Sequence, residues 1–334
     1  MSESRAQITL ITTGGTIGEV SHSDTGHRHL LAEQLLRSLP VPDHVKVSTI
    51  DLLDLPSTFM TFSHMLQVAK AVEMAIPEGA DGVVVTHGTD TLEETAYFVD
   101  LVISKERPVV FTGAMLPPEL PGADGPLNLH NAILVASAAE ARGRGVLVTF
   151  AGEIHAAQEV TKSHTMSVAA FKSLEFGPLG TVDEQRVVFA RWAPVTETIP
   201  LAEVTTRVEA LKCYAAMSDV ALRALTTAGF DGVVLETLGS GQVPPHLMPA
   251  IRDAIRAGIV VVAATRCPAG RLVREHYGLP IRVDGDERDL LDAGVIFSDL
   301  QGPKARIKLA VALSAGLQRE AVRQLFEPTG DVRA

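Results

Sequence analysis

Short apolar segments alternate with amphipathic ones along this chain, and this alternation limits the possible folds more than any other feature of the sequence. In the first part, apolar and β-branched runs predict buried strands at 8–13, 45–52, 82–86, 109–112 and 146–150. Amphipathic segments lie between them, so that a strand followed by a helix recurs about every thirty residues. Strands separated by helices form βαβ units, and the sequence therefore predicts an α/β fold with a mainly parallel sheet and crossover helices.

The helices of the first part are predicted from their apolar spacing and from the residues that bound them. Their expected ranges are 30–39, 63–76, 92–104 and 127–141. Ser63 is a plausible N-cap for the second of them. A long polar loop that contains Lys162 follows the fifth strand, and residues 181–190 resemble a short extended pair.

A second part of the chain repeats the same theme. Strands are expected at 211–215, 232–236, 259–265 and 295–297, and helices at 218–228, up to residue 257, near Arg288 and within 303–326. The segment between the two parts contains Pro194 and Pro200 and lacks a clean period. We therefore expect an N-terminal α/β domain at 1–190, a linker at 191–210 and a C-terminal α/β domain at 211–334.

The composition of the chain limits which kinds of molecule it is expected to bind. The formal net charge is −11, which makes nucleic acid and anionic membranes poor partners. No apolar stretch is long enough to span a membrane, and the first ten residues do not resemble a secretory signal. The only cysteines, Cys213 and Cys267, have no metal-ligand spacing, although their pairing stays open. A cytoplasmic protein is the expectation from these features.

The first strand ends at a glycine turn that carries a hydroxyl group. Gly14 and Gly15 permit a tight turn and a close approach of backbone, and Thr16 follows them. Ligands of open α/β sheets bind at the carboxyl ends of strands, and a hydroxyl surrounded by free N–H groups suits a nucleophile. Taken alone, an ordinary turn with an incidental threonine is an equally good interpretation. A nucleotide-binding loop is not, because neither glycine-rich fingerprint is present.

Other polar residues stand at or near further strand ends of the first part. Thr89 and Asp90 follow the third strand, and Ala114 lies in the turn after the fourth. Together with Lys162 they could form a relay in which the carboxylate orients the lysine and the neutral amine acts as base. Each residue alone has an ordinary explanation, either a helix cap or a solvated lysine. His87 is expected to be a packed, hydrogen-bonded side chain rather than a base.

The combination of these motifs resembles the L-asparaginase family of the bacterial type. The residues that carry the resemblance are Thr-Gly-Gly-Thr-Ile at 13–17 and Val-Thr-His-Gly-Thr-Asp-Thr-Leu-Glu-Glu-Thr-Ala at 85–96. It continues through the loop of Ser57 and through 113–115, 123–129, 160–162, 171–173 and, more weakly, 239–242 to the end. The first two motifs together are highly specific, whereas neither would be decisive alone.

The resemblance implies a reaction and the residues for it. Thr16 matches the family's nucleophilic threonine, and Thr89, Asp90 and Lys162 match its second threonine, aspartate and lysine. Backbone N–H groups near Thr89 and Ala114 resemble the oxyanion hole. The implied activity is hydrolysis of L-asparagine to L-aspartate and ammonia through an acyl-enzyme ester, without metal or cofactor.

Substrate-binding residues follow from the same resemblance. Asp90 resembles the residue that holds the α-amino group of the substrate, and Ser57 the residue that binds its α-carboxylate. Gly15, Gly88, Thr89 and Ala114 belong to the same expected site. Thr58 stands where many members have a glutamine, and Leu116 where many have an arginine. These departures leave the choice between asparagine and other small amides open.

The family's assembly is also implied. Members of the family have a larger N-terminal domain with a parallel sheet and a smaller flavodoxin-like C-terminal domain. They form homotetramers that are built as dimers of dimers. Each site lies between the N-terminal domain of one subunit and the C-terminal domain of a partner, where Gln242 matches an asparagine and Glu275 is the expected acidic residue. The loop 18–29 lacks the tyrosine of many members. The hypothesis is that His27 or His29 takes over part of its contact, or that the relay acts without it, and simple solvation of both histidines is at least as good an interpretation.

Several alternatives stay open beside an L-asparaginase. The nearest are a glutaminase-asparaginase and a hydrolase of another small amino-acid amide. A non-catalytic amino-acid sensor of the same fold is of a different class. Occupation of all four catalytic-type positions favours an enzyme.

Overall fold

A computed structural model describes residues 5–22, 26–37, 39–193, 196–273, 275–276, 279–280 and 290–327. The chain divides between Thr198 and Ile199 into two compact units, which we call the first and the second unit. This agrees with the expected two-domain α/β fold. The first strand of the second unit, β13, begins at Val208, inside the range expected to be a linker.

The first unit is built on an eight-stranded sheet with the order β12-β11-β8-β7-β6-β5-β1-β4. Neighbouring strands from β7 to β4 are parallel, which confirms the expected βαβ units. Beyond β7 the pairing becomes antiparallel, and this edge extends the sheet further than the sequence predicted. The strands are β1 (Ala6–Thr12), β4 (Val45–Asp51), β5 (Gly82–Thr86), β6 (Val109–Thr112), β7 (Val146–Phe150), β8 (Glu153–Ala156), β11 (Gly180–Asp183) and β12 (Arg186–Phe189).

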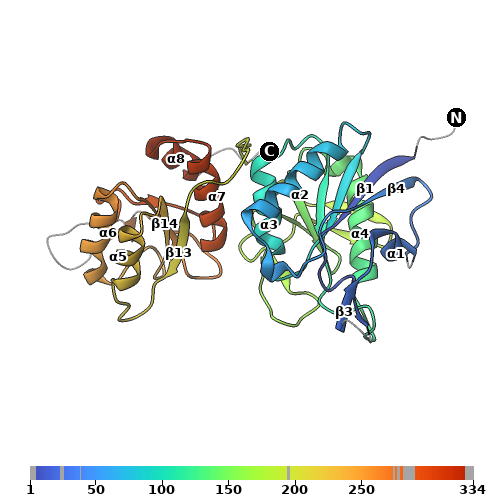
Figure 1. Ribbon diagram of the computed structural model, residues 1–334, viewed down its shortest axis with the longest axis horizontal. Coiled ribbons are helices and arrows are strands. Elements are labelled where there is room, and N and C mark those ends of the chain that lie inside the picture. The colour runs from blue at the N-terminus through green and yellow to red at the C-terminus, as the bar shows by residue number, and fades with distance from the viewer. Residues whose placement is uncertain are drawn as a thin grey trace. The chain divides into compact units, whose positions relative to one another are not determined.

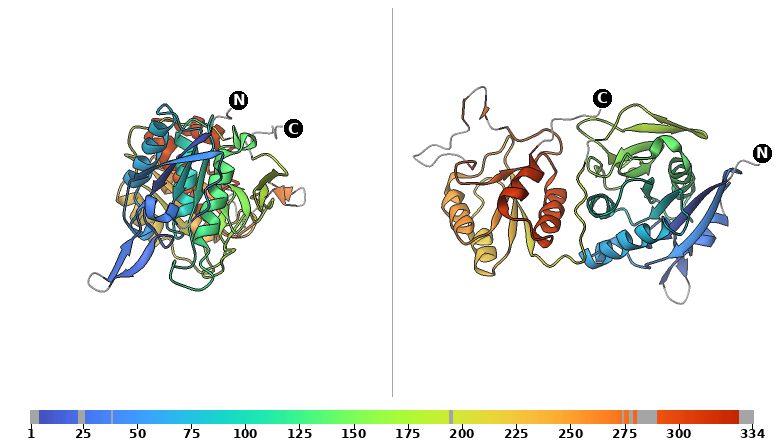
Figure 2. Two further views of the ribbon diagram at one scale, coloured as in Figure 1. Left: turned by 90° about the vertical axis from the view of Figure 1, so that its right-hand side faces the viewer. Right: turned by 90° about the horizontal axis from the view of Figure 1, so that it is seen from above.

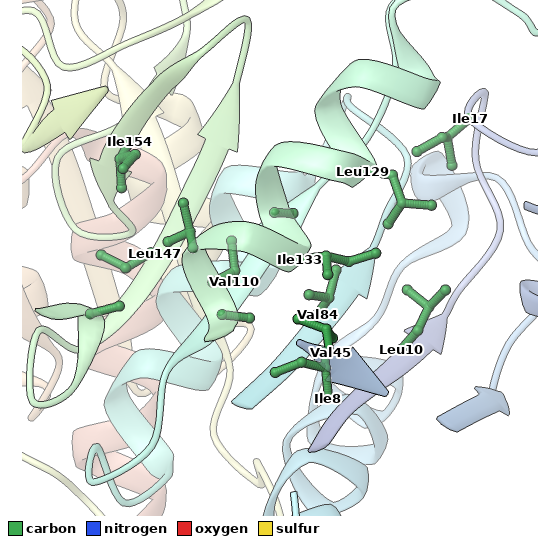
Figure 3. Close-up of a cluster of buried hydrophobic side chains, with 14 of the residues drawn as sticks. Ile8, Leu10, Ile17, Val45, Val84, Val110, Leu129, Ile133, Leu147 and Ile154 are labelled. Atoms are coloured by element: carbon green, nitrogen blue, oxygen red, sulfur yellow. The ribbon is translucent and has the colours of Figure 1, made fainter. Parts of the chain in front are cut away.

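Helices cover both faces of this sheet (Figures 1 and 2). On one face, α4 (Gly125–Ser137) and α1 (Ala32–Arg37) pack on the core strands, and on the other lie α2 (Phe62–Ala75) and α3 (Leu92–Val102). Leu129 and Ile133 of α4 pack with Leu10 and Val84 of the sheet, as Figure 3 shows. Ile17 belongs to the same buried cluster, which anchors the turn after β1 in the core.

Some boundaries differ from those predicted. Helix α2 is capped by Thr61, whose hydroxyl accepts the His64 N–H at 3.3 Å, and not by Ser63. The predicted helix 127–141 begins at Gly125 and ends at Ser137, where a short 3₁₀ helix, η2 (Ala139–Ala141), continues the chain.

Two segments that were expected to be loops contain short antiparallel pairs. The polar segment after β1 forms β2 (Glu19–His22) and β3 (Gly26–His29). For His27 and His29, in β3, the structure describes the backbone only. Lys162 lies in β9 (Thr161–Lys162), which pairs with β10 (Phe171–Lys172). The partners in each pair are neighbours in the sequence, but strands of two to four residues are too short to show a clear alternating pattern.

The second unit has a four-stranded parallel sheet with the order β13-β14-β15-β18. Helices α5 and α6 share one buried cluster with its strands, whereas α7 packs on β13, β14 and β15. The predicted helix near Arg288 lies outside the described residues. The elements are β13 (Val208–Lys212), α5 (Val220–Thr227), β14 (Gly232–Thr237), η3 (Pro245–Leu247), α6 (Met248–Arg256), β15 (Val260–Thr265), β16 (Glu275–His276), β17 (Leu279–Pro280), β18 (Ile296–Phe297), α7 (Gly302–Ser314) and α8 (Arg319–Phe326).

Two further sequence expectations concern the cysteines and the membrane. Cys213 and Cys267 are both free, and burial raises the pKa of the Cys213 thiol to about 11. Within the part of the chain that the structure describes, every helix is too short or too polar to cross a bilayer.

Candidate functional site

The turn after β1 brings backbone against backbone. Gly14 and Gly15 have φ angles of +93° and +91°, which glycine adopts without strain. A Cβ atom added at Gly15 would lie 2.5 Å from the Cα of Gly88, so only glycine permits this approach. Thr16 follows, partly exposed, and its hydroxyl has no hydrogen-bond partner among the described residues. The glycines thus place this free hydroxyl beside the turn after β5.

Ser57 lies on the other side of Gly88. Its Oγ accepts the backbone N–H of Asp90 at 3.2 Å, and its carbonyl oxygen accepts the Thr91 hydroxyl at 2.8 Å. A Cβ at Gly88 would lie 2.7 Å from the Ser57 Oγ. The short helix η1 (Ser57–Phe59) presents Ser57 in this way, whereas the side chain of Thr58 is exposed. The loop after β4 is therefore fastened directly to the second motif.

Lys162 reaches both candidate relay partners. Its Nζ donates to the Thr89 Oγ1 at 2.9 Å and to the Asp90 Oδ1 at 2.7 Å. The backbone N–H of Lys162 donates in turn to the Glu93 Oε2 at 2.8 Å, which ties strand β9 to the first turn of α3. The Lys162 side chain is 18% exposed and that of Asp90 is 58% exposed. A pair that meets water contributes little to stability, so its fixed geometry is better explained by function.

The turn after β6 completes this edge of the sheet. A Cβ at Gly113 would lie 2.5 Å from the His87 carbonyl oxygen and 3.5 Å from the Thr89 Cγ2, so the two turns pack directly together. Ala114 is 1% exposed, and Thr89 is 8% exposed. Their N–H groups have no acceptor among the described residues. Two buried, unbonded N–H donors at one edge are suited to stabilising a negative oxygen.

His87 stays neutral in this environment. Its Nδ1 lies 2.8 Å from the Gly88 carbonyl oxygen and therefore carries the proton, while Nε2 is buried without a partner in the described part of the chain. Burial lowers the pKa of His87 to about 4, although the hydrogen bond to Gly88 acts in the opposite direction. This agrees with the packed, hydrogen-bonded histidine that the sequence predicted.

Two expected substrate-binding residues belong to the second unit. Gln242 lies in a turn after β14, where its carbonyl oxygen accepts the Leu238 N–H at 2.7 Å, and its side chain is exposed. Glu275 lies in β16 and is described in its backbone only. Within the described ranges, His, Cys, Asp and Glu side chains form no group able to hold a metal ion.

Three residues at this edge escaped the sequence interpretation. From the sequence, Glu93 is only a favourable charge at a helix N-terminus. Asp124 and Asn128 belong to a family motif without a role, although they bond to the turn after β6. Their spacing from that turn matches no helical or strand period, so only the motif itself could have drawn attention to them.

Comparisons with known proteins agree over nearly the full chain. Residues 7–195 match the family model described as "Asparaginase, N-terminal", and residues 207–326 match "Glutaminase/Asparaginase C-terminal domain". A probable L-asparaginase of Deinococcus radiodurans is 40% identical, with 98% of each chain covered. An L-asparaginase of Bacillus licheniformis is 35% identical, over 96% of this chain and 98% of its own. The crystal structure of a probable cytoplasmic L-asparaginase from Campylobacter jejuni has a TM-score of 0.85 at 31% identity, covering 96% of this chain and 99% of its own.

Proposed function

The chain belongs to the bacterial-type L-asparaginase family, and we infer from this that it hydrolyses L-asparagine to L-aspartate and ammonia. One observation supports the assignment most directly. Lys162 bonds to both Thr89 and Asp90, beside a glycine turn that presents the unpaired hydroxyl of Thr16. A nucleophile, a relay and free N–H donors are the groups that acyl transfer requires.

The first half of the reaction forms an ester. The Thr16 Oγ attacks the carbon of the side-chain amide, and its proton leaves toward the relay of Thr89 and Lys162. The carbonyl oxygen becomes negative and is stabilised by the N–H groups of Thr89 and Ala114. The C–N bond then breaks, the nitrogen takes up a proton, and ammonia departs.

The second half regenerates the enzyme. Water gives a proton to the same relay and attacks the ester carbon, so that aspartate forms and the Thr16 hydroxyl is restored. The relay works in both halves because the Thr89 Oγ1 and the Lys162 Nζ lie 2.9 Å apart, close enough for a proton to pass between them. Asp90 stabilises the ammonium that forms, at 2.7 Å.

The ends of the substrate are held by groups around the glycines. The Oδ1 of Asp90 binds Lys162, whereas its Oδ2 has no partner among the described residues and can accept the α-ammonium. Ser57 binds the α-carboxylate, with the backbone of Gly15 and Gly88 against the substrate. Thr58 lies at the rim, where its short side chain contributes less than a glutamine would.

Assembly and location are part of the same proposal. The protein forms a homotetramer, a dimer of dimers, in which Gln242 of the partner subunit and Glu275 of the partner subunit complete each site. It is cytoplasmic, in line with its similarity to the probable cytoplasmic L-asparaginase of Campylobacter jejuni. Neither metal nor cofactor takes part, and neither nucleic acid nor membrane is a partner.

The test is release of ammonia from a panel of small amides, measured in steady state with asparagine and glutamine side by side. We expect asparagine to give the highest kcat/KM. A higher value for glutamine would favour a glutaminase-asparaginase, for which the rim residues Thr58 and Leu116 are the first candidates. No release from any amide would contradict the assignment and favour the sensor.

A further inference from the structure

We propose that Asp124 and Asn128, in and just before the first turn of α4, are positioning residues for the reaction. They hold the turn 113–116 so that the Ala114 N–H stays free to bind the negative oxygen of the reacting amide. This inference rests on the proposed function. It assigns a role to two side chains that need not touch the substrate.

Asp124 does not cap the helix that it precedes. It occupies the N-cap position of α4, yet its side chain makes no capping hydrogen bond there. Its Oδ1 instead accepts the N–H of Leu116 at 2.9 Å and that of Met115 at 3.1 Å, and its Oδ2 lies 3.0 Å from the same Met115 nitrogen. A helix begun by aspartate normally uses that carboxylate for itself, so this arrangement serves the neighbouring turn.

Asn128 fixes the same turn from its other side. Its Nδ2 donates to the Gly113 carbonyl oxygen at 3.0 Å and to the Asp124 Oδ2 at 3.1 Å. Its Oδ1 accepts the N–H of Ala151, after β7, at 3.0 Å. The residue is 1% exposed, and its bond to Gly113 is buried, where breaking it is costly.

The two side chains together bind the turn on both sides of Ala114 and leave its N–H unbonded. Met115 and Leu116 give their N–H groups to Asp124, and Gly113 gives its carbonyl to Asn128. A buried N–H without an acceptor is rare in folded proteins, because it costs about as much as a lost hydrogen bond. The Ala114 N–H has no acceptor among the described residues, and the bonds on either side fix its direction.

The start of α4 also touches the turn of the proposed nucleophile. A Cβ at Gly125 would lie 3.0 Å from the Ile17 Cγ1 and 3.3 Å from the Ala114 Cβ. The helix terminus therefore contacts the residue after Thr16 and the candidate oxyanion donor at once. Its position sets the separation between nucleophile and donor, and small misplacements of reacting groups lower rates strongly.

The experiment compares Asp124→Ala with a carboxylate of the same kind at the other end of the sheet. Asp81 accepts the Gln7 N–H at 3.0 Å, and Asp81→Ala is the matched control. We expect Asp124→Ala to lower kcat for asparagine about 10²-fold, the usual effect of losing one oxyanion donor, with KM within about threefold. The control should lose comparable thermal stability and keep wild-type kcat.

A second variant keeps the test decisive if the alanine protein does not fold. Asp124→Asn retains one acceptor oxygen but places an NH₂ group against another donor, and we expect kcat to fall about tenfold with an unchanged circular dichroism spectrum. Wild-type kcat in a folded Asp124 variant would overturn the proposal. If the wild-type protein itself releases no ammonia from any amide, the proposed function has failed instead, which separates the two outcomes.

Discussion

The polar groups at the amino end of the first-unit sheet and those at its carboxyl end differ in how fully they are hydrogen-bonded. At the amino end, before β5, Asp81 is saturated. Its Oδ2 accepts the Gln7 N–H at 3.0 Å, and its Oδ1 lies 3.2 Å from Arg107 and 3.8 Å from Arg142. Its own backbone N–H binds the Gln7 carbonyl oxygen at 2.7 Å. In this cluster both carboxylate oxygens and the backbone N–H of Asp81 are bonded within the protein.

At the carboxyl end, several polar groups are held in place without partners among the described residues. They are the hydroxyl of Thr16, the N–H groups of Thr89 and Ala114, and the Nε2 of His87. Each of these groups belongs to a turn that is held in place. Some turns are held by close backbone contacts at glycine, and others by hydrogen bonds from distant residues. The comparison teaches that unmet hydrogen-bonding capacity, held rigidly, distinguishes the end proposed to carry the reaction from the opposite end.

Removing the unpaired hydroxyl should produce the largest change. We expect Thr16→Ala to lower kcat by roughly 10⁴-fold while the fold stays intact, because the ester can no longer form. Thr16→Ser, which keeps a hydroxyl, should retain part of the activity. The measurement is ammonia release, with circular dichroism as the check of folding. Near-wild-type rates in the alanine variant would move the nucleophile, most simply to Thr89.

Replacing the lysine should have the next largest effect. Lys162→Met removes the relay amine, and we expect kcat to fall by roughly 10³-fold, within the range of general acid–base groups. The control is Lys172→Met in the paired strand β10, which loses a bond to the Glu153 Oε2 at 2.8 Å. Near-wild-type kcat in Lys162→Met would make that lysine structural.

The buried histidine should give the smallest effect, on stability rather than rate. Its pKa is about 4 in the folded protein against 6.5 in the unfolded chain, so acid favours unfolding. The stability is present above pH 6.5 and is lost as pH falls toward 4, by about 3 kcal/mol. Urea unfolding across this range should show a shallower loss for His87→Gln. Parallel curves for the two proteins would contradict a neutral His87.

Much of this fold could be predicted because its signals are local. The strands 82–86, 109–112 and 146–150 have the predicted bounds, since β-branched runs there meet glycine or proline. The antiparallel pair β11–β12 corresponds to the extended pair expected at 181–190. The pair of β9 and β10 escaped because strands of two residues show no alternating pattern, and the pairing of β8 with β11 escaped because other segments separate these strands in sequence. The cap of α2 was misplaced by two residues, as Thr61 and Ser63 are equally good caps by composition.

The residues of the candidate site also divide into those with a local signal in the sequence and those without one. Thr16, Thr89 and Asp90 could be singled out because each follows a predicted strand at or beside glycine. The closeness of Lys162 to two of them needed a family resemblance, since nothing local joins residues so far apart in sequence. Asp124 would be expected to cap its own helix, and only three-dimensional structure reveals that it bonds to a different turn.

The contact between Gly15 and Gly88 has a consequence for engineering this enzyme. Since the two backbones touch without any side chain between them, the turns that carry Thr16 and Thr89 can only move as one body. A larger substrate cannot be accommodated by trimming this contact, because glycine has no side chain to remove. Redesign of substrate range should therefore begin at the perimeter, where the exposed Thr58 and the partly exposed Leu116 can change size freely.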